Sequence, residues 1–164
     1  MDDTEEQAKT RRVVRGIRAE AARVLKDDTG WHVRLLARRT GERLDRALAP
    51  HGLTSAQFLL MCLVASAPYD TVGGLARLAG LDQSTLSRNL AVLQRQGMVE
   101  MVAASADRRR RAVWLTEAGL FALHDALPDW RAAHADIVAR IGAEGAAAIA
   151  AAAGSLESAN DNAG

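Results

Sequence analysis

Hydrophobic residues recur at helical spacing along most of the chain, and polar segments separate the runs. The first run, from Thr4 to Lys26, predicts an amphipathic helix whose apolar stripe consists of Val13, Val14, Ile17, Ala21, Val24 and Leu25. A second amphipathic helix is expected from Trp31 to Leu48, because Pro50 follows it directly. Residues Phe58 to Ala67 are apolar nearly all round and predict a central, buried helix that ends before Pro68.

Two shorter helical patterns follow, Val72 to Ala79 and Gln83 to Gln96, with Gly80 to Asp82 between them. The next apolar or β-branched runs, Met98 to Ala103 and Arg111 to Leu115, flank a polar stretch. This arrangement predicts a β-hairpin with a long, charged tip.

The C-terminal part is again helical by pattern. A helix is expected from Thr116 to about Ile141, and Pro128 predicts a kink or a break within it. Gly142 separates it from an alanine-rich helix, Ala143 to Glu157, and residues 159–164 are expected to be frayed.

This order of elements predicts a mainly α fold with a small β-hairpin wing. A winged helix-turn-helix is embedded between N- and C-terminal helices, an arrangement that suits a dimer. The expected segments are an N-terminal extension (1–30), core helices for dimerisation and scaffold (31–71), a DNA-binding region (72–116) and C-terminal dimerisation helices (117–158).

The formal net charge of +1 hides an uneven distribution. Residues 71–116 carry seven arginines against three acidic residues, and residues 31–53 carry five arginines against two. Residues 117–164 carry two arginines against seven acidic residues. A basic middle and an acidic C-terminal part indicate that any electrostatic partner meets the middle of the chain.

Other chemistry finds little support in the sequence. Cys62 is the only cysteine, which excludes an intramolecular disulfide and a cysteine-based zinc cluster; its apolar neighbours favour an inert thiol over a redox sensor. No two histidines have the i, i+4 spacing of a helical metal site, and no catalytic constellation or phosphate-binding loop is present. We therefore expect no enzyme, cofactor or metal, and, since no signal peptide or membrane span is recognisable, a soluble cytoplasmic protein.

The helix-turn-helix prediction rests on three positions. Ala76 supplies the small residue where two helices cross, Gly80 with Leu81 forms a turn that needs positive φ, and Leu86 anchors the second helix. The inner face is completed by Leu75, Ala79, Leu90 and Leu93. Asp82 stands at the N-cap of the second helix. The outer face of that helix is the candidate reader of the major groove and carries Gln83, Ser84, Thr85, Ser87 and Arg88. Any amphipathic helical pair joined by a glycine has a similar pattern.

The predicted hairpin makes the DNA-binding interpretation stronger. Four consecutive arginines, Arg108, Arg109, Arg110 and Arg111, stand at its tip, where arginine can enter a narrow minor groove or pair with phosphates. Asp107 is close enough in sequence to hold one guanidinium in position.

Taken together, these motifs make residues 31–158 resemble the MarR family of bacterial regulators. The resemblance is carried by LTSAQFLLM, by GLARLAGLDQSTLSRNLAVLQRQGMVE and by the wing DRRRRAVWLTEAG. It implies that Ser84, Thr85 and Arg88 occupy recognition-helix contact positions and that Asp107 and Arg109 form the wing pair. It also implies an obligate homodimer, a pseudo-palindromic operator and, in many members, a small ligand. Asn89 departs from the pattern, which usually has an apolar residue there.

The family's ligand location suggests a pocket between the second helix and the buried third. Its candidate lining is Trp31, His32, Leu35, Met61 and Cys62, and its ligand a small aromatic or phenolic effector. Alternatively, Trp31, Trp114 and Trp130 are core or dimer-interface residues. The basic N-terminal helix either extends the dimer interface or contacts flanking phosphates.

The sequence thus predicts a sequence-specific, ligand-responsive repressor that binds double-stranded DNA as a homodimer. The alternative from another class is a winged-helix module for protein contacts, in which the arginine tip binds an acidic surface.

Overall fold

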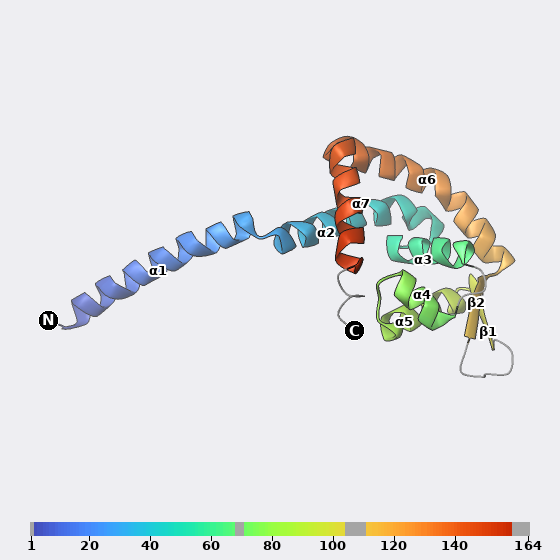
Figure 1. Cartoon of the computed structure of the whole chain (residues 1–164), viewed down its shortest axis with the longest axis horizontal. Helices are drawn as coiled ribbons and strands as arrows, with labels where there is room; N and C mark the ends of the chain where they lie inside the picture. The colour runs from blue at the N-terminus through green and yellow to red at the C-terminus, as the bar shows by residue number, and fades with distance from the viewer. Residues whose placement is uncertain (1, 68–70, 104–110, 159–164) are drawn as a thin grey trace. The chain divides into compact units, whose positions relative to one another are not determined.

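The computed structural model describes residues 2–67, 71–103 and 111–158. Its contacts divide the chain into an N-terminal unit, Met1–Thr40, and a C-terminal unit, Gly41–Gly164. Figure 1 labels the α-helices and strands. The elements are α1 (Asp2–Asp27), α2 (Thr29–Leu48), the short 3-10 helix η1 (Ala49–His51), α3 (Ser55–Ser66), α4 (Val72–Leu78), α5 (Gln83–Arg95), β1 (Val99–Ala103), β2 (Arg111–Leu115), α6 (Glu117–Ile141) and α7 (Ala143–Ser158). The predicted order of helices, helix-turn-helix, hairpin and helices is confirmed.

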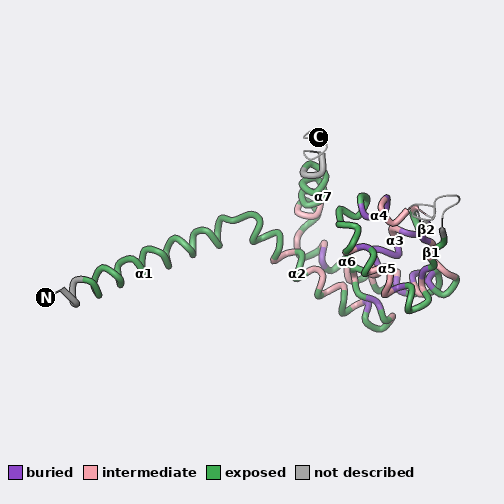
Figure 2. Tube along the Cα trace, turned by 90° about the horizontal axis from the view of Figure 1, so that it is seen from below, coloured by how far each residue is buried: buried purple, intermediate pink, exposed green. Residues whose placement is uncertain are grey.

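In the N-terminal unit, α1 is an uninterrupted helix whose described side chains are all exposed, as the colouring of Figure 2 shows. Its predicted apolar stripe is present but uncovered; Ile17, for example, is 65% exposed. The periodicity therefore predicts the helix correctly, but no described residue of the N-terminal unit buries its apolar stripe.

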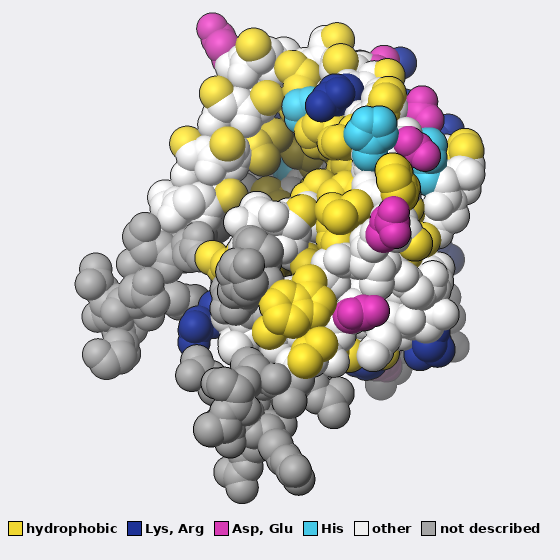
Figure 3. All heavy atoms as spheres, turned by 90° about the vertical axis from the view of Figure 1, so that its right-hand side faces the viewer, with side chains coloured by type: hydrophobic (Ala, Val, Ile, Leu, Met, Phe, Trp, Pro, Cys, Tyr) yellow, Lys and Arg dark blue, Asp and Glu magenta, His cyan; other side chains and the backbone are white. Residues whose placement is uncertain are grey.

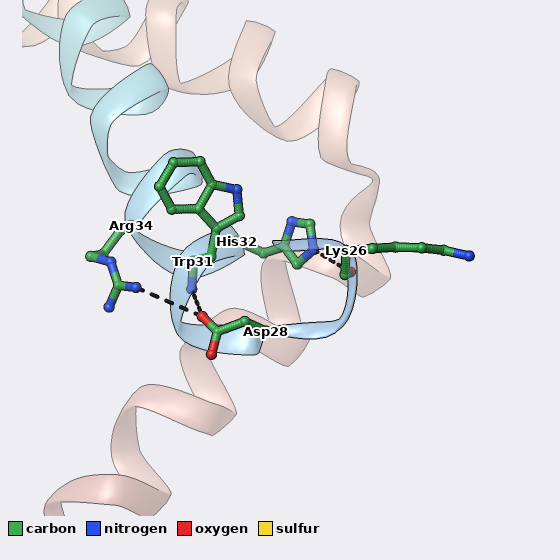
Figure 4. Close-up of polar contacts among 5 residues, drawn as sticks. All are labelled: Lys26, Asp28, Trp31, His32 and Arg34. Atoms are coloured by element: carbon green, nitrogen blue, oxygen red, sulfur yellow. Dashed lines mark hydrogen bonds and ion pairs between the residues drawn. The ribbon is translucent and has the colours of Figure 1, made fainter. Parts of the chain in front are cut away.

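The junction of α1 and α2 is held by Asp28 (Figure 4). The Asp28 carboxylate accepts the Trp31 N–H and lies 3.7 Å from the Arg34 guanidinium. His32 Nε2 donates to the Lys26 carbonyl oxygen at 2.8 Å, because a carbonyl can only accept. With these contacts α2 begins at Thr29, two residues before the predicted start.

The core of the C-terminal unit surrounds α3. Thr54 begins this helix with a capping box, in which its hydroxyl accepts the Gln57 N–H and the Gln57 side chain accepts the Thr54 N–H. The buried cluster around α3 includes residues from the end of α2, from α4, α5, both strands and α6: Leu48, Leu53, Phe58, Leu60, Met61, Val64, Leu75, Ala76, Leu86, Leu90, Leu93, Val99, Val113, Leu123 and Ala126. The prediction of a central α3 is confirmed.

The hairpin pairs β1 with β2 in antiparallel register, from Val99 opposite Leu115 to Ala103 opposite Arg111. Val99 and Val113 turn into the core. An isolated antiparallel bridge between Thr71 and Ala112 adds one pairing that the sequence did not predict. The strands of the wing are therefore anchored on the same core as α3.

Helix α6 narrows the expectation of a kink or a break at Pro128. The helix continues from Glu117 to Ile141, so there is no break, and Figure 1 shows α6 bowed along its length. Proline removes one hydrogen bond of the helix. On either side of it, Ala126 is fully buried and Trp130 stacks on Phe58 with ring centroids 5.8 Å apart. This packing holds the helix together across the proline.

By length and composition, no single helix of the described chain could cross a membrane; two pairs of helices joined at a bend, α2 with α3 and α6 with α7, pass the same criteria only when taken together.

Candidate nucleic-acid interface

The helix-turn-helix is built from α4, a tight turn and α5. Thr71 caps α4 by accepting the Gly74 N–H at 3.2 Å. Gly80 has a φ of +61°, and the Leu81 and Gly80 N–H groups donate to the carbonyls of Ala76 and Arg77. This is the Schellman pattern that ends a helix at a left-handed glycine. The predicted role of Gly80 in the turn is confirmed, and Ala76 is buried between the helices as expected.

Of the residues expected on the inner face, Ala79 is exposed instead, and so is Leu81, the residue expected beside Gly80 in the turn. Ala79 is the C-cap of α4 and Leu81 is 42% exposed. Because the Schellman turn rotates the chain away from the α4 axis at this point, helical periodicity no longer describes where these side chains lie.

Helix α5 is fixed by one face and open on the other. Leu86, Leu90 and Leu93 are fully buried. Asn89, on the same helix, is half-buried. The outer residues that the sequence assigned to DNA reading lie in the first two turns; Thr85 is half-buried, and the exposed ones are Gln83, Ser84, Ser87 and Arg88. The structure therefore presents a cluster of short polar groups and one cation on a rigid helix.

Asp82 organises the first turn of α5. Its Oδ1 accepts the Thr85 N–H at 2.8 Å, which confirms the predicted N-cap. The same oxygen accepts the Ser84 hydroxyl at 2.5 Å, and Oδ2 accepts the Thr85 hydroxyl at 2.7 Å. The hydrogen bond from the Ser84 side chain, followed by those from Thr85, holds the pKa of the Asp82 carboxyl well below its ordinary value.

Arg88 lies back along this turn. Its Nε donates to the Ser84 carbonyl oxygen at 3.3 Å, and its Nη2 donates to the Thr85 hydroxyl oxygen at 3.2 Å. Asp82, Thr85 and Arg88 thus form a continuous hydrogen-bonded series. The sequence located all three residues but gave no signal for the series, because it depends on side-chain rotamers.

The far end of α5 connects to the wing. Gly97, with a φ of +71°, ends α5 in a second Schellman turn, and the Thr116 hydroxyl donates to the Gly97 carbonyl oxygen at 2.6 Å. Thr116 also caps α6 by accepting the Gly119 N–H at 3.0 Å. One residue therefore links the end of α5, the end of β2 and the start of α6.

The tip of the wing lies outside the described residues. This applies to Asp107, Arg108, Arg109 and Arg110, while Arg111 is described only as the first residue of β2. The assignment of these five residues to DNA contact remains a prediction.

The residues of the expected ligand pocket fall in two units. In the N-terminal unit, Trp31 is 40% exposed, His32 is bound to the Lys26 carbonyl and Leu35 is half-buried. In the C-terminal unit, Met61 is fully buried and Cys62 is half-buried, and burial raises the pKa of the Cys62 thiol. The pocket stays a prediction, and the raised pKa agrees with an inert thiol.

Trp130 and Trp114 differ from Trp31 in their surroundings. Trp130 is half-buried against the core, between Phe58 and the ring of His134, whose centroid is 4.9 Å away. Trp114 is half-buried on β2.

Within the described residues, no three His, Cys, Asp or Glu side chains come together as a metal site would require.

The C-terminal unit also keeps large hydrophobic side chains at its surface, among them Leu120 and Phe121 on α6. Figure 3 shows hydrophobic side chains gathered over the middle of one face of the molecule.

Comparison with known proteins identifies this arrangement. A family model described as "MarR family" matches residues 51–110, which include α3, α4, α5 and β1. The Transcriptional regulator HosA from Escherichia coli O127:H6 is 33% identical over 92 residues, which cover 56% of this chain and 68% of HosA.

Solved structures agree. The transcriptional regulator MosR of M. tuberculosis in complex with DNA superposes with a TM-score of 0.73 at 33% identity, covering 83% of this chain and 98% of MosR. A mutant of E. coli MarR complexed with operator DNA gives a TM-score of 0.72 at 22% identity over 81% of this chain and 96% of MarR, which shows the shared fold. On the match to HosA and MosR, and on a fold that places a winged helix-turn-helix among helices, this chain belongs to the MarR family of transcriptional regulators.

Proposed function

We propose that this regulator binds double-stranded DNA sequence-specifically through α5 and the wing, acts as a repressor and has no catalytic activity. The observation that carries the proposal is the first two turns of α5, where Gln83, Ser84 and Arg88 are exposed on a helix whose opposite face is fully buried. Short polar groups and an arginine at the start of a rigid helix suit the edges of bases in the major groove. The DNA complexes of MosR and MarR support the assignment.

The DNA-bound form is proposed to be a homodimer on a pseudo-palindromic operator. The support is apolar surface that one chain leaves open: Ile17 and Val24 on α1, and Ile149 on α7, where residues 147–155 are all exposed. Contact with a second copy would remove such surface from water. Two copies of α5 would then enter successive major grooves about one helical turn apart.

A small aromatic or phenolic effector is proposed to regulate DNA binding through the predicted pocket of Trp31, His32, Leu35, Met61 and Cys62. An effector relieves repression only if it binds better to a form with wrongly spaced reader helices. Tryptophan fluorescence, titrated with a panel of phenolic acids, should change for a true effector, which should also lower DNA affinity.

The test of the main proposal is a gel-shift measurement at several salt concentrations, with operator fragments selected from the source genome. Arg109→Ala should cost roughly 1–3 kcal/mol of binding free energy. Arg110→Glu should weaken binding to all sequences and flatten the dependence on salt, because fewer counterions are released. Arg131→Ala, an exposed arginine on α6, is the matched control and should bind like the wild type.

If both wing variants bind DNA as tightly as the wild type, the wing does not contact DNA. If the wild type shows no salt-sensitive shift on any promoter fragment, the interaction module with an acidic protein partner is the better explanation.

A further inference from the structure

Two hydroxyl groups on the reader face of α5 share a single carboxylate. Ser84 Oγ lies 2.5 Å from Asp82 Oδ1, and Thr85 Oγ1 lies 2.7 Å from Asp82 Oδ2. These distances are those of hydrogen bonds to an ionised acceptor. Each such bond requires one proton between its two oxygens.

The source of both protons follows from the chemistry of the groups. The low pKa of Asp82 keeps its carboxylate ionised at neutral pH, so it has no proton to give. Each hydroxyl has one hydrogen. Ser84 and Thr85 therefore both donate to Asp82, and neither hydroxyl keeps a hydrogen for any other partner.

Only lone pairs remain on these hydroxyls. One lone pair of the Thr85 oxygen accepts from Arg88 Nη2 at 3.2 Å. In the major groove, the hydrogen-bond donors are the N6 amino group of adenine and the N4 amino group of cytosine, whereas thymine O4, guanine O6 and the purine N7 atoms are acceptors. A hydroxyl that can only accept a hydrogen bond cannot form one with these acceptor atoms.

We propose that Asp82 is a positioning residue that sets the base preference of α5, by restricting Ser84 and Thr85 to accepting hydrogen bonds from adenine N6 or cytosine N4. The inference rests on the proposed function, because it assigns a polarity to contacts that the DNA-binding proposal requires. It also gives Asp82 a role that a helix cap alone does not have, since the cap needs only one of its two oxygens.

The substitution Asp82→Asn separates the two roles. The asparagine oxygen can still accept the Thr85 N–H and so cap α5. Its amide nitrogen donates to the Thr85 hydroxyl oxygen instead of accepting from it, which releases the Thr85 hydrogen for a base acceptor. The variant also loses one negative charge near the phosphates, so its affinity for non-specific DNA should rise.

The experiment is selection and sequencing of bound duplexes from a random library, with the full-length wild type, Asp82→Asn and Thr85→Val. Thr85→Val removes the hydroxyl and keeps nearly the same side-chain shape. The position of the selected motif at which this variant loses the base preference of the wild type is therefore the position that Thr85 contacts. At that position the wild type should prefer the base with the amino group by about threefold to tenfold, the ratio expected for one neutral hydrogen bond. Asp82→Asn should lose or invert that preference while binding random DNA more tightly.

Thr71→Ala is the matched control, because it removes the N-cap of α4 in the same motif without touching either hydroxyl. It should lower stability and leave every base preference unchanged. Circular dichroism checks that Asp82→Asn keeps the helical content of the wild type.

The outcomes separate the two claims. If the wild type selects a motif and Asp82→Asn retains its preference at the position assigned by Thr85→Val, the inference is overturned and DNA binding stands. The inference is equally overturned if Thr85→Val abolishes no preference. If the wild type selects no motif from the library, the proposed function fails, and the inference with it.

Discussion

Helices α1 and α5 have similar sequence patterns and opposite surroundings. Both carry an apolar stripe at helical spacing with arginine beside it. On α5 the stripe of Leu86, Leu90 and Leu93 is fully buried, while on α1 Ile17 is 65% exposed. The difference teaches that hydrophobic periodicity identifies a helix and its apolar side but not the surface that covers it.

The same contrast separates what each helix can do. Because α5 is packed on the core, its outer polar groups are held in fixed positions, and Asp82 holds two of them, Ser84 and Thr85, by hydrogen bonds. The exposed stripe of α1 instead leaves an apolar surface available to another molecule. A fixed helix suits recognition of a base sequence, and an uncovered one suits assembly.

The largest expected effect comes from shortening one apolar residue in each stripe. Leu90→Ala should lower the free energy of unfolding by about 2–5 kcal/mol, because it leaves a cavity in a fully packed core. Ile17→Ala should change it by less than about 0.5 kcal/mol, since its side chain is already in water. Urea denaturation of both variants at low protein concentration measures the difference.

A loss of stability for Ile17→Ala as large as that for Leu90→Ala would break the comparison. If the free energy of unfolding rises with protein concentration in the wild type but not in Ile17→Ala, α1 is covered by a second copy of the chain.

Glycines provide a second, smaller contrast. A Cβ at Gly119 on α6 would lie 2.0 Å from the Met98 carbonyl oxygen, whereas a Cβ at Gly16 on α1 meets nothing within 4 Å. Gly119→Ala should therefore cost roughly 1–3 kcal/mol, the usual range for overpacking against a backbone that cannot move freely. Gly16→Ala should stabilise α1 by about 0.5–1 kcal/mol through helix propensity.

Thermal unfolding followed by circular dichroism reports both changes. The expected signs are opposite: a lower transition temperature for Gly119→Ala, and a higher helical signal for Gly16→Ala. A neutral Gly119→Ala would show that the approach of α6 to Met98 is not fixed.

Much of the fold follows from the sequence because local signals agree with one another. The turn at Gly80, the cap at Asp82 and the buried Leu86 are all read from residue type and spacing, and each is confirmed. The two strands of the wing are also predicted within one residue of their observed bounds.

Other features depend on geometry that spacing does not encode. The exposure of Leu81 follows from the direction of a turn, and the continuity of α6 across Pro128 follows from packing of Trp130 on Phe58. The series from Asp82 through Thr85 to Arg88 depends on rotamers. Composition and period carry no information on these choices.

The smallest expected effect concerns α2, whose side chains change from exposed at its start to buried at Leu48. In the C-terminal unit Asp45 Oδ1 accepts the Ser55 N–H at 2.6 Å, and hydrogen bonds from Ser55 lower the pKa of the Asp45 carboxyl. A carboxyl whose pKa is lower in the folded state contributes stability above its unfolded pKa, about 3.9, and loses it as the pH falls through the folded value.

Asp45→Asn should therefore be slightly less stable at neutral pH and lose less stability on acidification than the wild type. Ser55→Pro is the matched test, because proline is tolerated at the first position of α3 and the substitution removes both the hydroxyl and the N–H of Ser55, the two groups whose hydrogen bonds lower the pKa of Asp45. Urea denaturation between neutral pH and the acid range measures the free energy of unfolding, which should fall less on acidification in both variants than in the wild type, and by the same amount in each. A fall as large as that of the wild type in either variant would show that this contact does not hold the end of α2 to α3.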